Sequence, residues 1–257
     1  MNAATLNVAS YNIHKGFSFF NRRMVVHELR ERLVSLDADL VFLQEVQGEH
    51  VRHAERMTDW PSVPQYQYLA EPVWTDFAYG RNAVYEHGHH GNAILSRYLI
   101  RRWDNVDISA HVFERRGLLH CEIEVPGLDQ PLHAICLHLA LNERGRRQQL
   151  QRISEHIHAL VPDDAPLVMA GDFNDWRQRA PRYLCEQLGL AEVFESTHGR
   201  PARSFPAALP LFALDRIYTR GFEVASARVM HGALWRRLSD HAALIARLRA
   251  LPSERRA

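Results

Sequence analysis

Lysine is nearly absent from this chain: of its 31 basic residues, Lys15 is the single lysine and the other 30 are arginine. Arginine is the side chain best shaped for bidentate contact with phosphate, but a bias in codon usage explains the excess more simply. The formal net charge of +1 argues against a strongly electrostatic grip on long nucleic acid, while a local basic cleft remains compatible with so neutral a total.

Cysteine and long apolar runs are scarce too. Cys121, Cys136 and Cys185 are scattered and show no Cys-x-x-Cys spacing, so neither a disulfide framework nor a structural zinc site is indicated. No apolar run reaches the roughly 18 residues of a membrane-spanning helix, and the first residues lack the basic and apolar regions of a signal peptide. We therefore expect a cytoplasmic, monomeric protein without a transmembrane segment.

The chain does have enough apolar sequence for one large core, because 46% of its 257 residues are apolar. No internal repeat, proline-rich linker or heptad run divides it. We expect a single domain over residues 1–250 and a polar C-terminal tail over residues 251–257. Candidate strands and helices alternate, but without the regularity of successive βαβ units.

The most informative segment is Pro166–Asp175, P-L-V-M-A-G-D-F-N-D. Its short apolar run stops at a glycine, which predicts a buried strand that presents Asp172 and Asn174 at its end, where ligand-facing groups gather in sheet proteins. An Asx-turn that merely closes the strand explains the same two residues equally well. The other strand ends must decide between these interpretations.

The same pattern recurs along the chain. Further strands are predicted at Leu6–Tyr11, Asp39–Leu43, Gly91–Ser96, Gly117–Val125 and Pro131–Leu139, and helices at Val25–Leu36, Leu150–Leu160 and Arg182–Leu188. The segment Leu214–Tyr218 follows the last of these helices. The stretch between Glu45 and Gly91 is predicted to be irregular. Polar residues fall at the strand boundaries and before the last segment, Ala242–Leu248: Asn12, Glu45, Asn92, His138, Asp215, Asp240 and His241.

The chemistry of this set is coherent. Carboxylates and carboxamides are hard oxygen ligands, which suit Mg²⁺ or Mn²⁺ better than zinc, and Glu45 is the first candidate ligand. Two histidines beside carboxylates can activate a water molecule and stabilise a developing negative charge. This combination predicts hydrolysis of a phosphoester by direct attack of water.

The order of these motifs and the residues in them resemble those of the endonuclease/exonuclease/phosphatase superfamily, which has a DNase I-like fold. The resemblance spans nearly the whole chain and places it nearest to bacterial members. It rests on seven segments in the family's order: Val8–Asn12, Leu43–Val46, Gly91–Arg97, Cys136–Leu139, Gly171–Asn174, Leu214–Tyr218 and Ser239–His241.

The resemblance implies a fold of mixed α and β structure, a four-layer sandwich of two packed mixed β-sheets flanked by helices, with the site at one edge. It also implies roles. Glu45 would bind Mg²⁺ with help from Asn12 and Asp240, and His241 with Asp240 would activate or orient water. The remaining catalytic residues would surround the phosphate and the leaving group: His138, Asp172, Asn174 and Asp215.

Plainer interpretations stand beside these. His138 alone would be a hydrogen-bonded core histidine, and Asp240 would cap a turn. Asn92 and Arg116 are expected to contact substrate, although a solvated arginine is as well supported at position 116. For His87–His90, H-G-H-H, an ordered loop beside the cleft is favoured over a metal site, because no oxygen or sulfur partners are spaced around it.

The substrate is left open among three classes. A divalent-metal-dependent hydrolase of a small or lipid-type phosphodiester or phosphomonoester is favoured. A DNA or RNA nuclease follows, using a few local arginines for phosphate contact. A catalytically inactive binding module on the same fold would require lost metal or histidine positions, whereas all seven segments carry theirs.

Overall fold

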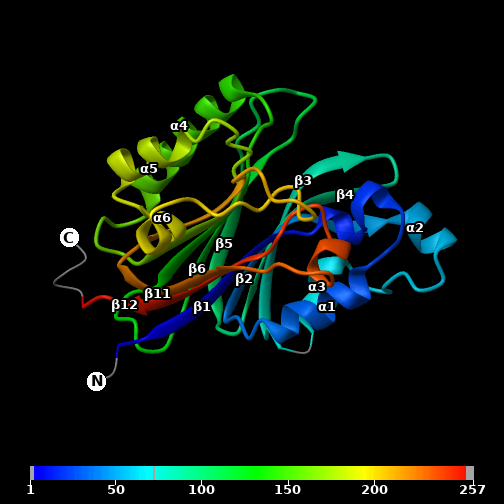
Figure 1. Cartoon of the computed structure of the whole chain (residues 1–257), viewed down its shortest axis with the longest axis horizontal. Helices are drawn as coiled ribbons and strands as arrows, with labels where there is room; N and C mark the ends of the chain where they lie inside the picture. The colour runs from blue at the N-terminus through cyan, green and yellow to red at the C-terminus, as the bar shows by residue number, and fades with distance from the viewer. Residues whose placement is uncertain (1–2, 72, 253–257) are drawn as a thin grey trace.

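The computed structural model describes residues 3–71 and 73–252 as two six-stranded sheets with helices on their outer faces (Figure 1). The first sheet has the order β11 (Phe222–Val229), β12 (Leu244–Ala250), β1 (Thr5–Asn12), β2 (Leu40–His50), β4 (Gly88–Ser96) and β3 (Asp76–Tyr85). The second has the order β5 (Ile100–Asp107), β6 (Gly117–Ile123), β7 (Leu132–His138), β8 (Leu167–Asp172), β10 (Asp215–Arg220) and β9 (Ala191–Glu192).

Both sheets are mixed, because β1 pairs with β2 and β7 with β8 in parallel while the other described pairs are antiparallel. The helices are α1 (Val26–Ser35), α2 (Val51–Arg56), α3 (Gln65–Ala70), α4 (Glu143–Leu160), α5 (Ala180–Leu188) and α6 (Val193–His198). Three short 3₁₀ segments are η1 (His14–Gly16), η2 (Phe19–Asn21) and η3 (Trp235–Arg237). Among the described residues, no helix is long and apolar enough to cross a bilayer.

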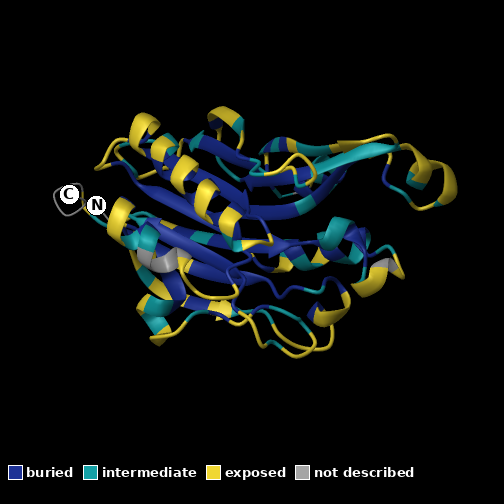
Figure 2. Ribbon diagram, turned by 90° about the horizontal axis from the view of Figure 1, so that it is seen from above, coloured by how far each residue is buried: buried dark blue, intermediate teal, exposed yellow. Residues whose placement is uncertain are grey.

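Strand alternation explains why the sheets stack. Val8 and Phe42 point into the core between the sheets, whereas their neighbours Ala9 and Val41 point outward into the layer that contains Leu29 of α1. A third apolar cluster joins the outer face of the second sheet to α4 and α5. Burial is therefore deepest in the central strands, and the exposed residues lie in helices, in loops and in parts of β3, β5 and β11 (Figure 2).

These layers confirm the predicted four-layer sandwich, and they correct two local predictions. The stretch between Glu45 and Gly91 is not irregular, because it holds α2, α3 and β3. The loop predicted for His87–His90 is wrong from Gly88 onward, since β4 begins there and pairs with both β2 and β3. Bulges in both pairings break the strict alternation that marks a strand in sequence. Residues 253–257 of the expected tail lie outside the described residues.

A chain of three histidines joins β6, β7 and α4 on the outer side of the second sheet. The imidazole of His120 contacts His156 Nε2 through Nδ1 at 3.0 Å and His133 Nδ1 through Nε2 at 2.9 Å. Burial, and then the neighbouring His133 and His156, lower the pKa of His120 to about 3. The chain is therefore uncharged in the folded protein near neutral pH.

This histidine chain predicts an acid-sensitive stability. An unfolded histidine has a pKa of about 6.5, so the contribution of His120 is complete above that pH and is lost as the pH falls toward its folded pKa of about 3. We expect His120→Gln to remove about 2 kcal/mol of the loss seen between neutral pH and about pH 5. Urea unfolding across that range measures it.

His158→Gln is the matched control, because His158 is exposed on the same helix as His156. Its acid loss of stability should equal that of the unaltered chain. Equal acid dependence in the His120 and His158 variants contradicts the assignment.

Candidate active site

One end of the sandwich, opposite the two termini (Figure 1), collects the polar strand-end residues. Asn12 ends β1, and His138 and Asp172 end the parallel pair β7 and β8 in direct register. Asp215 begins β10 opposite Asp172, because β10 runs antiparallel to β8. His241 precedes β12, which runs antiparallel to β1. Strand direction alone thus brings residues from both sheets to one edge.

Close approach of β7 and β8 fixes the centre of this edge. Gly171 has a φ of 151°, and a Cβ at this position would lie 1.9 Å from the carbonyl oxygen of Leu137. Only glycine fits there. The following residue, Asp172, consequently reaches His138, whose Nε2 lies 3.5 Å from Asp172 Oδ2.

Asp172 is the buried carboxylate that the other groups surround. Its Oδ1 accepts a hydrogen bond from the backbone N–H of Asn174 at 2.9 Å, and its Oδ2 accepts one from Asn12 Nδ2 at 3.1 Å. Burial raises the pKa of Asp172 to about 6, although the charge of His241 opposes the rise. This carboxylate therefore titrates close to neutral pH.

His241 forms an ion pair with Asp215. Its Nδ1 lies 2.8 Å from Asp215 Oδ2, and its Nε2 lies 3.7 Å from Asp172 Oδ2. Burial alone would lower the pKa of His241, but Asp215 and then Asp172 outweigh it and raise that pKa to about 10. The imidazole is therefore held in its protonated form at neutral pH.

Glu45 lies beside this cluster at a bulge in β2, where its φ is 55°. Burial by itself would raise the pKa of Glu45, but its neighbours His138 and Lys15, followed by His14 and His241, lower that pKa to about 2. Lys15 Nζ lies 3.4 Å from Glu45 Oε2, and Asn12 Nδ2 lies 3.5 Å from Glu45 Oε1. Glu45 is therefore a permanent anion in a mostly buried position.

Asp240 contacts His14. Its Oδ1 lies 3.3 Å from His14 Nδ1, while His241 pairs with Asp215. Asp240 and His241 thus belong to two separate pairs, although the charge of Asp240 still helps to raise the pKa of His241. The reason is geometric, because β10 presents Asp215 directly to the imidazole from the second sheet.

The remaining predicted residues take supporting positions. Asn174, at a φ of 48°, donates its side-chain amide to the carbonyl of Leu139 at 3.0 Å. Asn92 is buried and donates to the carbonyls of Gly117 and Cys136, at 3.1 and 3.4 Å. Arg116 Nη2 donates to Glu114, and the charge of Arg116 helps burial to lower the pKa of His138 well below its usual range. His138 is therefore a neutral imidazole.

Sequence reasoning missed His14, Lys15 and His90. Burial and then the charge of Lys15 lower the pKa of His90 to about 4, and the charge of Glu45 opposes that shift. One signal was present in the sequence: Lys15 is the single lysine, and the structure places its ammonium group against Glu45. No feature of the sequence predicted the left-handed backbone of His14, Lys15 and Glu45, whose φ angles are 45°, 58° and 55°. Side chains of this kind take it only at a cost of about 1–3 kcal/mol.

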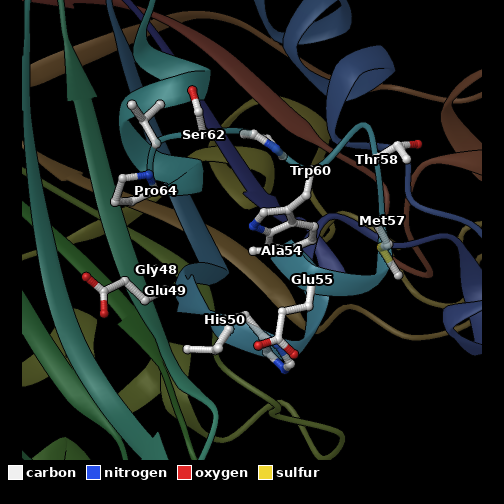
Figure 3. Close-up of a pocket in the computed structure, with 13 residues that line it drawn as sticks. Gly48, Glu49, His50, Ala54, Glu55, Met57, Thr58, Trp60, Ser62 and Pro64 are labelled. Atoms are coloured by element: carbon white, nitrogen blue, oxygen red, sulfur yellow. The ribbon is translucent and has the colours of Figure 1, made fainter.

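A pocket of about 570 Å³ lies beside α2 and is lined by residues such as His50, Glu55 and Trp60 (Figure 3). It shares no residue with the cluster around Asp172. Its nearest link to that cluster along the chain is Gly48, which follows Glu45 on the same strand. We therefore place the chemistry at the carboxylate and histidine cluster and not in this pocket.

Buried oxygen atoms that accept no hydrogen bond show which residues fit a divalent cation. Glu45 Oε2 and Asp215 Oδ1 are two such atoms, and the Lys15 ammonium group lies 3.4 Å from Glu45 Oε2. One ligand atom each from Asp172, Asp215 and His241 lie within 4.8 Å of one another. A protonated imidazole has no free lone pair, so the oxygen atoms are the better donors, and an oxygen-rich set fits a hard cation such as Mg²⁺.

Residues 9–241 match the model of the endonuclease/exonuclease/phosphatase family. The match begins in β1 and ends at His241, so it includes the whole cluster described above. The chain belongs to this family, and the resemblance seen in its motifs is confirmed.

The chain is 47% identical over 244 residues to the uncharacterized protein YbhP of Escherichia coli K12, which covers 95% of this chain and 96% of that protein. Its fold is similar to an endonuclease/exonuclease/phosphatase from Beutenbergia cavernae, with a TM-score of 0.76, 19% identity and coverage of 97% of this chain and 72% of that one. It is also similar to the mannosyl-6-phosphatase Bt3783 of Bacteroides thetaiotaomicron, with a TM-score of 0.73, 17% identity and coverage of 95% and 99%. At these identities the structures show the fold alone.

The close approach at Gly171 gives a direct test of the site's construction. In Gly171→Ala the new Cβ would meet the carbonyl oxygen of Leu137 at 1.9 Å, so β7 and β8 must separate. We expect a loss of about 3 kcal/mol or more in the free energy of unfolding, measured by urea denaturation. Gly199→Ala is the matched control, since nothing lies within 4 Å of its Cβ position and only its φ of 66° is strained. Similar losses in the two variants would count against the proposed close packing.

Proposed function

We propose that this protein is a divalent-metal-dependent phosphoesterase that hydrolyses a phosphodiester or phosphomonoester by direct attack of water. The substrate class that we favour is a small or lipid-type phosphoester. The observation that carries the proposal is the buried Asp172 carboxylate, with a pKa near 6, between a neutral His138 and a protonated His241. Phosphoryl transfer to water needs a base that accepts the proton of the attacking water and a cation that stabilises the negative charge on the phosphoryl oxygens. Asp172 and His241 lie close enough together to supply both.

Glu45 would hold the cation, with Asn12 and Asp240 as its neighbours. The low pKa of Glu45 and its buried Oε2, which accepts no hydrogen bond, support this assignment. A Mg²⁺ ion bound there, or Mn²⁺ in its place, would neutralise charge on a phosphoryl oxygen. Lys15 already lies 3.4 Å from Glu45 Oε2, so its ammonium group would share contact with the same anionic substrate.

The chain's own residues divide the remaining work. Asp172 accepts the proton of the attacking water, because its Oδ1 and Oδ2 are fixed by Asn174 and Asn12 and its pKa lies near the ambient pH. His241 carries a positive charge toward the phosphoryl group, and Asp215 fixes the ring through Nδ1. Nε2 of His241 is left to donate to a phosphoryl oxygen.

Neutral groups complete the site. His138 lies 3.5 Å from Asp172 on the opposite side from β10, and its uncharged imidazole can orient the water or the leaving group without adding charge. Arg116, whose charge acts on His138, is the cation that we assign to a second phosphoryl or substrate oxygen. We assign Asn92 to the substrate-binding surface, where its side-chain amide donates to the carbonyl groups of Gly117 and Cys136 and so fixes their position.

The proposal predicts metal-dependent activity that needs Asp172 and His241. Purified protein with Mg²⁺ or Mn²⁺ is assayed against a chromogenic phosphodiester, phospholipids, inositol phosphates, single-stranded DNA, plasmid DNA and RNA. We expect Asp172→Asn and His241→Ala each to lower kcat/KM by about 10² to 10⁴, while the exposed Asp163→Asn leaves it unchanged. Activity that survives in both site variants shows that the site is elsewhere. Turnover of nucleic acid alone would instead support a nuclease.

Metal binding has its own readout in thermal unfolding. Mg²⁺ should raise the Tm of the unaltered chain, because a ligand that binds only the folded state stabilises it. Glu45→Gln should abolish that rise, and the exposed Glu49→Gln on the same strand should keep it. A Tm that Mg²⁺ does not move in any variant supports a metal-free binding module.

A further inference from the structure

Exposed apolar side chains are distributed unevenly over this protein. In the described part of the chain, all but three of the exposed large apolar side chains belong to segments at the end of the sandwich that holds the active site. The three exceptions are Leu99, Trp103 and Leu160. A monomeric protein has no need of such one-sided exposure, and exposed apolar patches mark interaction surfaces.

The first group of these side chains flanks His14 and Asp240. Phe19 and Phe20 are 44% and 67% exposed, and their ring centroids lie 3.9 Å apart. Phe20 has a φ of 62°, a strained conformation for a bulky residue, which is maintained although its ring points to solvent. Leu234, 53% exposed, lies just before η3, and η3 borders the same hollow as the two phenylalanines.

Arginine surrounds this first group. Arg22, Arg23, Arg236 and Arg237 line the same hollow as Phe19 and Phe20. Arg23 is paired with Glu28, whereas no described carboxylate lies within 4 Å of the other three guanidinium groups. The guanidinium of Arg22 lies 5.4 Å from the ring centroid of Phe20. Unneutralised arginines beside exposed aromatic rings complement an anionic surface with an apolar interior.

A second group flanks His241. Trp176, 40% exposed, packs edge-on against Phe212, 41% exposed, with 4.9 Å between ring centroids. Phe205 contacts Trp176 on one side and the His241 ring on the other. Leu209, 66% exposed, extends from the same loop. This apolar group is therefore in direct contact with the His241 imidazole through Phe205.

A third group flanks His138. Phe113, 90% exposed, and Val112 lie in the loop between β5 and β6, and Leu141 follows β7. The two segments are joined because Leu141 N–H donates to Glu114, which also accepts from Arg116. Three apolar groups thus border the site next to His14, His241 and His138. We call them the rim.

We propose that the rim docks this protein onto an anionic lipid surface, so that the active site faces the membrane and acts on a phosphoester in or at that surface. The docking rests on the geometry of the rim, while the choice of substrate rests also on the proposed function. Aliphatic members of the rim decide between lipid and single-stranded nucleic acid. Bases stack on aromatic rings, but Leu141, Leu209 and Leu234 gain nothing from stacking and gain free energy in acyl chains.

The test is sedimentation of the full chain with vesicles of phosphatidylcholine alone and of phosphatidylcholine mixed with phosphatidylglycerol. We expect binding to the mixed vesicles that weakens with salt. Phe19→Ser/Phe20→Ser should lower the partition coefficient about tenfold, and Arg22→Gln/Arg236→Gln/Arg237→Gln should remove the preference for anionic vesicles. Leu99→Ser/Trp103→Ser, which changes exposed apolar residues outside the rim, should bind as the unaltered chain does.

The docking would be overturned if the protein sedimented with neither vesicle, or if the rim and control variants bound equally. A solution dimer that buries the rim would also overturn it. So would binding to single-stranded DNA that the phenylalanine variant loses, in a protein that does not bind vesicles. Hydrolysis of a soluble chromogenic phosphodiester is measured in parallel and should be the same in all these variants. Vesicle binding without any hydrolysis leaves the docking supported and removes the proposed function. Hydrolysis without vesicle binding supports the proposed function and overturns the docking.

Discussion

The ion pair between Asp215 and His241 is the interaction on which the rest of the site depends. It joins the first residue of β10, in one sheet, to the segment that leads into β12, in the other. Asn12 and Asp172 form a second polar contact between the same two sheets. At this edge, polar contacts replace the apolar packing that joins the sheets elsewhere. Removing one partner of such a buried pair typically costs about 3–5 kcal/mol, because the other charge is left unpaired.

The same pair acts on the charge of Asp172, and other neighbours set the charges of His138 and Glu45. With His241 held as a cation, Asp172 can ionise near neutral pH in spite of its burial. His138 stays neutral, and Glu45 stays anionic beside Lys15. The site therefore combines a carboxyl group that titrates near neutral pH, a cationic imidazole and a carboxylate anion, each produced by burial and by named neighbours. The rim of exposed apolar and arginine side chains surrounds this polar centre, which suggests how a charged substrate at a lipid surface would reach it.

Much of this could be predicted from the sequence, and the residues show why. The strand ending at Asp172 and the positions of Glu45, His138 and His241 follow from apolar runs with polar ends, and their order along the chain matches the family. The partner of His241 could not be predicted, because Asp215 and Asp240 are both carboxylates at strand ends and only the crossing of the sheets selects between them. β3 and the start of β4 were hidden by bulges. His14 and Lys15 reach the site because their backbone is left-handed, and no local sequence pattern predicts that conformation.

The protonation of His241 is the most direct measure of this account. Ring ¹⁵N chemical shifts of His241, recorded on the metal-free protein at neutral pH, should show protons on both Nδ1 and Nε2, because Asp215 and Asp172 raise its pKa to about 10. Replacement of Asp215 by asparagine should return the ring to the neutral form at that pH. A neutral His241 in the unaltered protein would contradict the account, since neither the charge on the imidazole nor the ionisation of Asp172 would then have its stated cause.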